Sequence, residues 1–386
     1  MKTYILLFAF TVFLSTTCVK NSNAQTANDA TLLEFYQAQR YLEAAAYLKS
    51  IYKEPITDPI ALRNLAYTSQ LAGKLVDAEG YYQRLFAIDS TKTNVLNSLA
   101  GINLRRGNLV KAGAYYARII AVDTANFFVL TQLSYIALRT GDTTNYINYL
   151  TRGNRVNPED PDVASDLSNW YVDKKQFVPA ENVLNKAVKA DTQNVTLLQS
   201  LLRLTHRQKK WPETVKTGLQ LLQLGDGTYL TAFKLAQAYY GLKNYVCCLE
   251  VLANLRRIEQ TESSYYYMGM CYENLKKYDK AVSYFELAIK EGLSPSIATY
   301  YGEMARSYQQ VNLTKKALIA YQKGLQFDES PMILYSLAIL YDEKLKNKAQ
   351  AVKYFKKYLS TNPPVSQQAL VNYTKSRVEI LTNKQH

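Results

Sequence analysis

The sequence predicts an all-α solenoid of about ten antiparallel helix pairs, followed by a C-terminal capping helix. Nine small residues and one tyrosine recur at near-constant spacing through most of the chain: Ala44, Ala78, Ala112, Tyr146, Ala180, Thr214, Cys248, Ala281, Ala317 and Ala351. The first six steps are 34 residues long, and the last three are 33, 36 and 34. Such a period indicates one supersecondary unit stacked on copies of itself. We therefore expect function to lie in an extended surface rather than in a catalytic cleft.

Each period divides into two helices joined by a turn. In the first clear unit, apolar and small residues fall at helical spacing on both sides of Gly73: Leu62, Leu65, Ala66 and Ser69, then Ala78, Tyr82 and Leu85. Gly73 tolerates the backbone angles that end a helix, and Gly107 and Gly141 follow at 34-residue intervals. Ala66 and Ala78 are expected to face each other, because small side chains let two crossing helices approach closely.

The N-terminus, residues 1–24, is predicted to be a signal peptide. Lys2 precedes an apolar run over residues 4–14, which is too short to span a bilayer. Small residues before and at Ala24 suit cleavage by a signal peptidase. The alternative is lipoprotein processing at Cys18, directly after the run. We therefore expect an exported protein, periplasmic or secreted, with anchoring at Cys18 as the alternative.

This pattern resembles the tetratricopeptide repeat, here of an exported bacterial type. The best copies run from Ser264 to Leu293 and from Met332 to Pro363. Residues of these copies that fit the family pattern are Tyr265, Met268, Gly269, Tyr272, Tyr278, Ala281, Phe285 and Ala288, then Leu337, Ala338, Tyr341, Ala351, Phe355 and Pro363. The resemblance covers about residues 28–363, ten units, and implies a right-handed superhelix. An amphipathic segment at 365–383 is expected to cap the last unit.

The resemblance also implies that the first helices of the units line a concave face. Their residues that point away from the small-residue core are candidates for a peptide-binding groove: Arg63, Tyr67, Asn97, Arg105, Tyr135, Arg139, Arg203, Arg207, Phe233, Lys234, Tyr240, Tyr266, Tyr267 and Arg306. Aromatic residues and arginines are the types that dominate binding hot spots, and arginine grips carboxylates with two hydrogen bonds. The alternative is that these aromatic rings only pack between first helices. Arg63, Asn64 and Asn97 match the family's carboxylate clamp only in part, so we predict no clamp.

The charge bounds the class of partner. The formal net charge is +14, and residues 341–386 hold nine Lys and Arg against three acidic residues. A basic surface attracts nucleic acid, anionic lipid, acidic glycans or acidic peptides, or it serves only to keep the protein soluble. Export argues against nucleic acid. We expect other proteins as partners, through extended or helical and often acidic segments, with association to the envelope surface as an alternative. The sequence does not determine the oligomeric state.

No catalytic or metal-binding pattern stands out. The sequence contains no GxSxG, HExxH, P-loop or CxxC motif. Of its two histidines, His206 has Arg203 and Arg207 as helical neighbours, and adjacent cations disfavour its protonation. We expect it to be a surface or groove residue. The chain is therefore predicted not to be an enzyme and to need no cofactor or metal.

Three cysteines remain beyond the signal peptide. Cys247 and Cys248 lie on the second helix of one unit, and Cys271 lies on the first helix of the next. Those helices should pack together, so a disulfide between Cys271 and one of the other two is compatible with an oxidising compartment. The alternative is that the cysteines act as small buried apolar side chains.

Together these features predict a non-enzymatic interaction scaffold of the bacterial cell envelope, which binds peptide segments of partner proteins in a concave groove. An assembly or secretion factor that holds client proteins in the manner of a chaperone is one alternative. Binding of anionic glycan or lipid through the basic C-terminal end is another.

Overall fold

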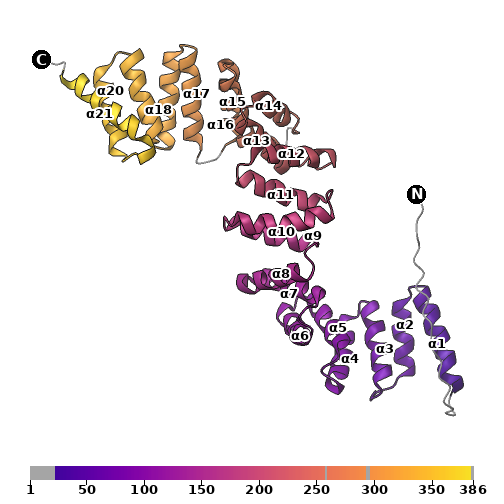
Figure 1. Cartoon of the computed structure of the whole chain (residues 1–386). Coiled ribbons are helices and arrows are strands. Elements are labelled where there is room, and N and C mark those ends of the chain that lie inside the picture. The colour runs from indigo at the N-terminus through magenta and orange to yellow at the C-terminus, as the bar shows by residue number, and fades with distance from the viewer. Residues whose placement is uncertain (1–21, 257–258, 293–295, 384–386) are drawn as a thin grey trace. The chain divides into compact units, whose positions relative to one another are not determined.

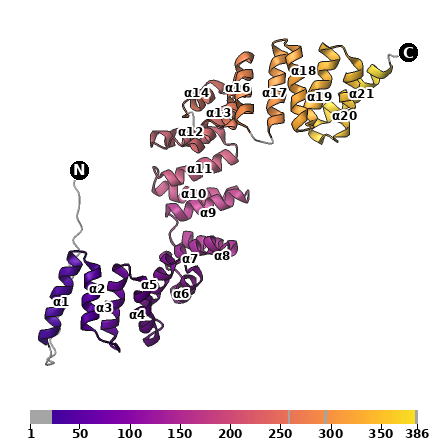
Figure 2. The same cartoon turned by 180° about the vertical axis from the view of Figure 1, so that it is seen from behind.

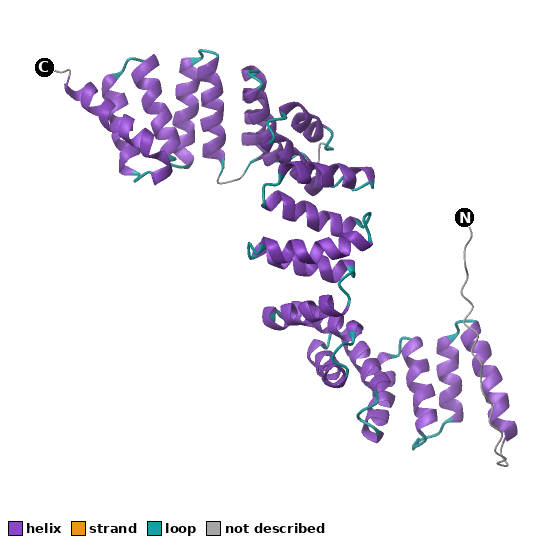
Figure 3. Cartoon of the chain, viewed as in Figure 1, coloured by secondary structure: helices purple, strands orange, loops and turns teal. Residues whose placement is uncertain are grey.

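The computed structural model describes residues 22–256, 259–292 and 296–383. Within these ranges the chain is built of helices joined by short turns and loops (Figure 3). The helices are α1 (Ser22–Gln37), α2 (Tyr41–Ile51), α3 (Pro59–Leu71), α4 (Leu75–Ile88), α5 (Thr93–Arg105), α6 (Leu109–Val122), α7 (Phe127–Thr140), α8 (Thr143–Val156), α9 (Pro161–Asp173), α10 (Phe177–Ala190), α11 (Val195–Arg207), α12 (Trp211–Gln223), α13 (Tyr229–Gly241), α14 (Tyr245–Ala253), α15 (Glu262–Asn274), α16 (Tyr278–Glu291), α17 (Ile297–Gln310), α18 (Thr314–Phe327), α19 (Pro331–Ile339), α20 (Lys348–Ser360) and α21 (Gln368–Asn383). Most of the predicted signal peptide, including Cys18, lies outside the described residues.

The chain forms two compact units. Unit 1 ends at Val156 and contains α1–α8, and unit 2 begins at Asn157 and contains α9–α21. Within each unit an odd-numbered first helix packs against the even-numbered second helix that follows it (Figures 1 and 2). In unit 2, successive first helices from α9 to α19 also contact one another. The predicted all-α array of paired helices is confirmed. Among the described residues, no helix is both long enough and apolar enough to cross a membrane.

The recurrent small residues are buried in the core of the helix array. Nine of the ten positions, all except Tyr146, have side chains with 0% exposure. Thr214 keeps its polar group satisfied there, because its hydroxyl donates to the carbonyl of Lys210 at 2.8 Å. The period in the sequence is therefore the period of helix contacts in the core.

A left-handed residue ends the first helix of every pair. These residues have positive φ and are spaced like the small residues: Gln39, Gly73, Gly107, Gly141, Lys175, Lys209, Lys243, Lys276, Asn312 and Lys346. Gly73 has a φ of 72°, a backbone conformation that glycine adopts without steric cost. The left-handed turn therefore recurs in every pair, with glycine in three pairs, glutamine in the first pair, and lysine or asparagine in every pair after Gly141.

A second repeating contact fastens the second helix to the loop before its own first helix. Arg118 and Arg152 donate to the carbonyls of Ser90 and Thr124, each at 3.1 Å and each 28 residues earlier. The equivalent donors Arg84 and Gln220 bond to Ile56 and Thr192. These bonds satisfy carbonyls that the loop leaves without a backbone partner.

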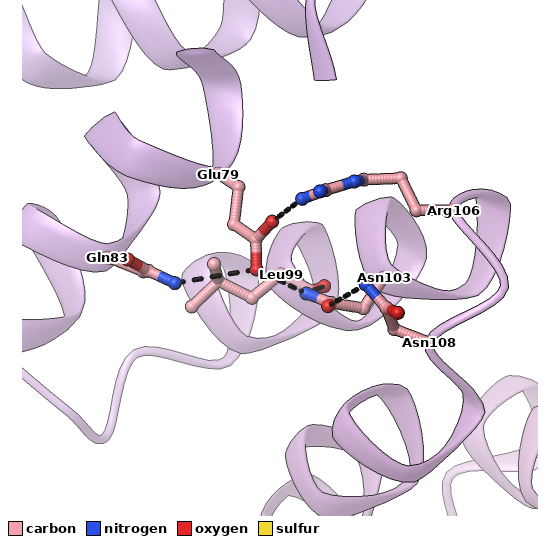
Figure 4. Close-up of polar contacts among 6 residues, drawn as sticks. All are labelled: Glu79, Gln83, Leu99, Asn103, Arg106 and Asn108. Atoms are coloured by element: carbon pink, nitrogen blue, oxygen red, sulfur yellow. Dashed lines mark hydrogen bonds and ion pairs between the residues drawn. The ribbon is translucent and has the colours of Figure 1, made fainter. Parts of the chain in front are cut away.

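A buried polar network joins α4 to α5 (Figure 4). Glu79, only 6% exposed, accepts from the amide of Asn103 at 3.1 Å and pairs with Arg106. The same amide of Asn103 donates to the carbonyl of Leu99 at 2.9 Å, and Asn108 donates to the Asn103 side-chain oxygen at 3.3 Å. The network links the second helix of one pair to the first helix of the next.

The last helix packs against α20. Val371 and Leu381 of α21 are buried. Arg377 donates through two nitrogens to the buried carboxylate of Asp342, at 2.6 and 3.0 Å. Asp342 lies in a short π-helical turn, η2 (Leu340–Lys344), at the end of α19. Because Arg377 makes two hydrogen bonds to the buried carboxylate of Asp342, this ion pair orients α21 as well as stabilising its attachment.

Candidate functional site

All fourteen candidate groove residues lie on first helices, and they divide between the units. Unit 1 carries Arg63 and Tyr67 on α3, Asn97 and Arg105 on α5, and Tyr135 and Arg139 on α7; unit 2 carries Arg203 and Arg207 on α11, Phe233, Lys234 and Tyr240 on α13, Tyr266 and Tyr267 on α15, and Arg306 on α17. Each unit therefore presents its own set of residues, and the two sets are described separately.

In unit 1, Arg63 and Tyr67 line a cavity of about 290 Å³ between α3, α4 and α5. Tyr82, Lys92 and Ser98 are among the other residues that line it. Tyr67 is 51% exposed, so its ring is available for contact. The cavity thus combines two cationic groups with aromatic rings. The periodicity did not indicate Lys92, because it lies in the turn before α5.

The other unit 1 candidates are not part of this cavity. Arg139 donates to the hydroxyl of Tyr135 at 3.0 Å and lies over its ring, 5.7 Å from the centroid. This local pair leaves both side chains exposed. The side-chain oxygen of Asn97 is buried and accepts no hydrogen bond from the described residues. Arg105 is exposed.

Unit 2 brings Arg203, Arg207 and Lys234 together. Burial and, to a smaller degree, the two arginines lower the pKa of Lys234 to about 8. Burial also lowers the pKa of His206, and the positive charge of Lys234 adds to that effect. Arg203 has an acidic partner, Asp173 of α9. Lys234 forms no ion pair with the described residues, so this cluster is a half-buried, poorly compensated positive site.

Aromatic rings continue from the basic cluster across α13, α15 and α17. Phe233 meets Tyr267 edge to face with ring centroids 5.5 Å apart, and Tyr240 meets the same ring at 5.5 Å. Tyr266 packs on Tyr267 at 5.9 Å, and burial raises the pKa of Tyr266 to about 12. All four rings are half-buried. They do pack between first helices, but each keeps part of its surface in water beside the cations.

Arg306 lies in a different electrostatic setting. It pairs with Glu303 of its own helix and lies 3.5 Å from Glu273 of α15. Burial raises the pKa of Glu273, and Arg306 partly offsets this. Arg306 and Glu303 line a cavity of about 380 Å³ together with Tyr321. Two carboxylates therefore compensate Arg306, which makes it a weaker anion ligand than the cluster on α11 and α13.

Two of the three cysteines lie together in the core. Cys248 and Cys271 are both 0% exposed and belong to one core cluster, whereas Cys247 is half-buried. All three are free thiols in this structure. A hydrogen bond with Cys248 and burial raise the pKa of the Cys271 thiol. The described residues contain no group of three His, Cys, Asp or Glu that could hold a metal ion.

Comparison with known proteins identifies two of the repeats. Residues 263–291 and 333–364 each match a family model of the tetratricopeptide repeat. These segments correspond to the pairs α15/α16 and α19/α20. No curated protein sequence matches the chain.

Several solved structures match the chain at low sequence identity. A tetratricopeptide repeat protein from Parabacteroides merdae is 16% identical, with a TM-score of 0.43, covering 64% of this chain and 98% of its own. YrrB, described as a repeat protein with an unusual peptide-binding site, is 18% identical, with a TM-score of 0.43 and coverage of 48% and 96%. The APC/C hetero-tetramer Cut9–Hcn1 gives 15% identity, a TM-score of 0.45 and coverage of 92% of this chain and 73% of its own. The chain therefore contains tetratricopeptide repeats at residues 263–291 and 333–364, within an array of ten helix pairs.

Proposed function

We propose that this protein is a non-enzymatic interaction scaffold that binds acidic peptide segments of partner proteins on the first helices of unit 2. Tetratricopeptide repeat proteins generally mediate binding to proteins or peptides. The observation that carries the proposal is Lys234, a half-buried cation beside Arg203 and Arg207 with no ion pair among the described residues.

A carboxylate is the ligand that this cluster fits best. Burial is the main cause that lowers the pKa of Lys234, and repulsion by Arg203 and Arg207 adds to it. A carboxylate placed among these three cations would relieve that repulsion as well as form new ion pairs. Arginine adds a planar pair of donors. The adjoining rings of Phe233, Tyr240 and Tyr267 offer apolar contact for neighbouring residues of the peptide.

The cellular setting is the second part of the proposal. The N-terminal features of residues 1–24 support export, so we place the scaffold in the periplasm or outside the cell, or at the membrane if Cys18 is lipidated. Its partners would then be other exported or envelope proteins.

Neutralising the cluster tests the proposal. The variant Arg203→Gln, Arg207→Gln, Lys234→Met removes three charges without introducing repulsion, and Lys186→Gln, Lys189→Gln, Lys290→Gln removes three exposed lysines from second helices as a matched control. Envelope proteins captured by the wild type are identified, and synthetic peptides covering their acidic segments are titrated against all three proteins.

We expect the cluster variant to bind the peptides at least tenfold more weakly, since each lost charge-assisted hydrogen bond contributes on the order of 1.5–3 kcal/mol. The control should bind like the wild type. Equal binding by the cluster variant and the wild type would exclude this site as the peptide groove.

A further inference from the structure

Among the described residues, every lysine at a left-handed position lies in unit 2. Unit 1 uses Gln39 and three glycines at this point of the first-to-second helix turn, whereas unit 2 uses lysine in five of six turns: Lys175, Lys209, Lys243, Lys276 and Lys346, with Asn312 in the remaining one. Their φ angles lie between 53° and 60°. Glycine adopts this conformation freely, but a residue with a Cβ is strained there.

Nothing in the fold explains these lysines. All five side chains are exposed, and none forms an ion pair or side-chain hydrogen bond with the described residues. Unit 1 shows that glycine serves the same turn, so the backbone does not require lysine. The positive charge of lysine is the remaining physical reason why these strained turn positions carry lysine instead of glycine.

The helix pairs of unit 2 are antiparallel and stacked, so these turns share one edge of the unit, which we call the turn edge. It comprises residues 174–177, 208–211, 242–245, 275–278, 311–314 and 345–348. Nine lysines and no acidic residue occur in these stretches. Acidic residues gather instead at the turns between pairs, on the opposite edge, as at Asp191, Asp328 and Glu329. The two edges of unit 2 therefore carry opposite charge.

The turn edge is also amphipathic. Each of four successive turn lysines is followed, two positions later, by a half-buried aromatic residue: Phe177, Trp211, Tyr245 and Tyr278. Phe177 and Tyr245 also pack against the core. In two of these turns the next residue is an exposed valine, Val178 at 69% and Val246 at 53%. Lysine, an aromatic ring and an exposed aliphatic side chain are the combination found where proteins meet the headgroup region of a bilayer. A soluble polyanion would match the lysines but would leave the valines without a role.

We propose that the turn edge of unit 2 docks on an anionic lipid surface. The lysines contact the headgroups, the rings lie at the headgroup level, and the valines enter the acyl boundary. The acidic opposite edge is repelled, which fixes the orientation of unit 2 on the membrane. This proposal goes beyond peptide binding, because the turn edge and the first-helix site use different residues.

Vesicle binding by the full chain provides the test. The readout is the ratio of affinity for vesicles of phosphatidylcholine with phosphatidylglycerol to affinity for phosphatidylcholine alone, so that any contribution of the apolar run at residues 4–14 cancels. The edge variant is Lys175→Gly, Lys209→Gly, Lys243→Gly, Lys276→Gly. Glycine fits these turns, so the melting temperature should not fall. The matched control is Lys186→Gln, Lys189→Gln, Lys290→Gln, Lys356→Gln, four exposed lysines on second helices.

The wild type should show an affinity ratio well above one. At low salt this ratio should be about a hundredfold or more lower in the edge variant, because each lysine near an anionic surface raises the affinity severalfold. The control should retain most of the ratio. Val178→Ser with Val246→Ser should weaken vesicle binding without weakening binding to heparin.

Three results would overturn the proposal: a wild-type ratio near one, an equal loss in the control, or binding to heparin without binding to vesicles. The last would assign the turn edge to a soluble polyanion. None of these results bears on the peptide site, whose residues are unchanged in all the variants.

Discussion

At the scale of single residues, Lys234 has the most informative environment among the candidate site residues. Burial of its side chain on α13 and, to a smaller degree, the neighbouring charges of Arg203 and Arg207 oppose its protonation. Sequence analysis could place Lys234 on a first helix, since helical periodicity fixes the face. It could not reveal the perturbed environment, which depends on how closely α11 and α13 pack.

The pKa of Lys234, about 8, predicts a pH dependence. The unfolded value is near 10.4, so between pH 8 and 10 the unfolded chain binds more protons and stability rises with pH. Below pH 8 the destabilising effect of the protonated group is fully present. An anionic peptide should bind best below pH 8 and raise the pKa. NMR titration of the lysine side chains measures this, and a Lys234 pKa near 10.4 in the free protein would contradict the account.

The left-handed turn residues predict opposite effects in the two units. Lys243→Gly should raise the free energy of unfolding by about 1 kcal/mol, because glycine relieves the strain of a positive φ but loses more chain entropy. Gly73→Ala should lower it by about the same amount. Urea denaturation measures both, and Lys186→Gly, in the middle of α10, serves as the control that should destabilise. Destabilisation by Lys243→Gly would show that its side chain stabilises the turn.

At the scale of elements, contacts between helix pairs hold polar groups that the period did not indicate. Glu79 directly follows a buried alanine of the repeat, and its carboxylate joins α4 to α5 through Asn103 and Arg106. Glu181 occupies the equivalent position 102 residues later and bonds to Lys210 at 3.2 Å, but it is far more exposed. The period predicts the helices well because small residues at crossings repeat. It does not predict such networks, since each is built differently.

Replacing Glu79 by Ala should therefore cost more than the equivalent change at Glu181. Loss of the buried carboxylate leaves the Asn103 amide and Arg106 without an acceptor, a penalty of about 1–3 kcal/mol. Glu181→Ala breaks an exposed pair and should cost less than about 1 kcal/mol. Thermal unfolding of the two variants compares them. Equal melting temperatures would mean that the Glu79 network contributes no more than a surface pair.

The attachment of α21 depends on Arg377. Its two hydrogen bonds to Asp342 are the polar link between this helix and η2. Arg377→Ala should speed amide exchange throughout α21, because the helix then relies on Val371 and Leu381 for docking. Exchange in α3 is the internal reference and should not change. Unaltered exchange in α21 would show that apolar packing alone holds the helix.

At the scale of the whole molecule, the array divides into two compact units at Val156. The repeat period runs through this boundary without interruption, so sequence periodicity could not locate it. The units also differ in chemistry: unit 1 uses glycine in three of its turns, and unit 2 uses lysine in five. Binding of a peptide on first helices and of a lipid surface on the turn edge would then be separate properties of unit 2.

Site-specific photo-crosslinking tests the central claim, peptide binding on first helices, most directly. A photoreactive phenylalanine analogue at Tyr267 reports on the first-helix surface of unit 2, and one at Ile319, 54% exposed on second helix α18, reports on the outer surface. We predict crosslinks from Tyr267 to acidic segments of partner proteins, lost on adding Arg203→Gln, Arg207→Gln and Lys234→Met. Crosslinks that form mainly from Ile319, or that persist at Tyr267 in the neutralised background, would contradict the account.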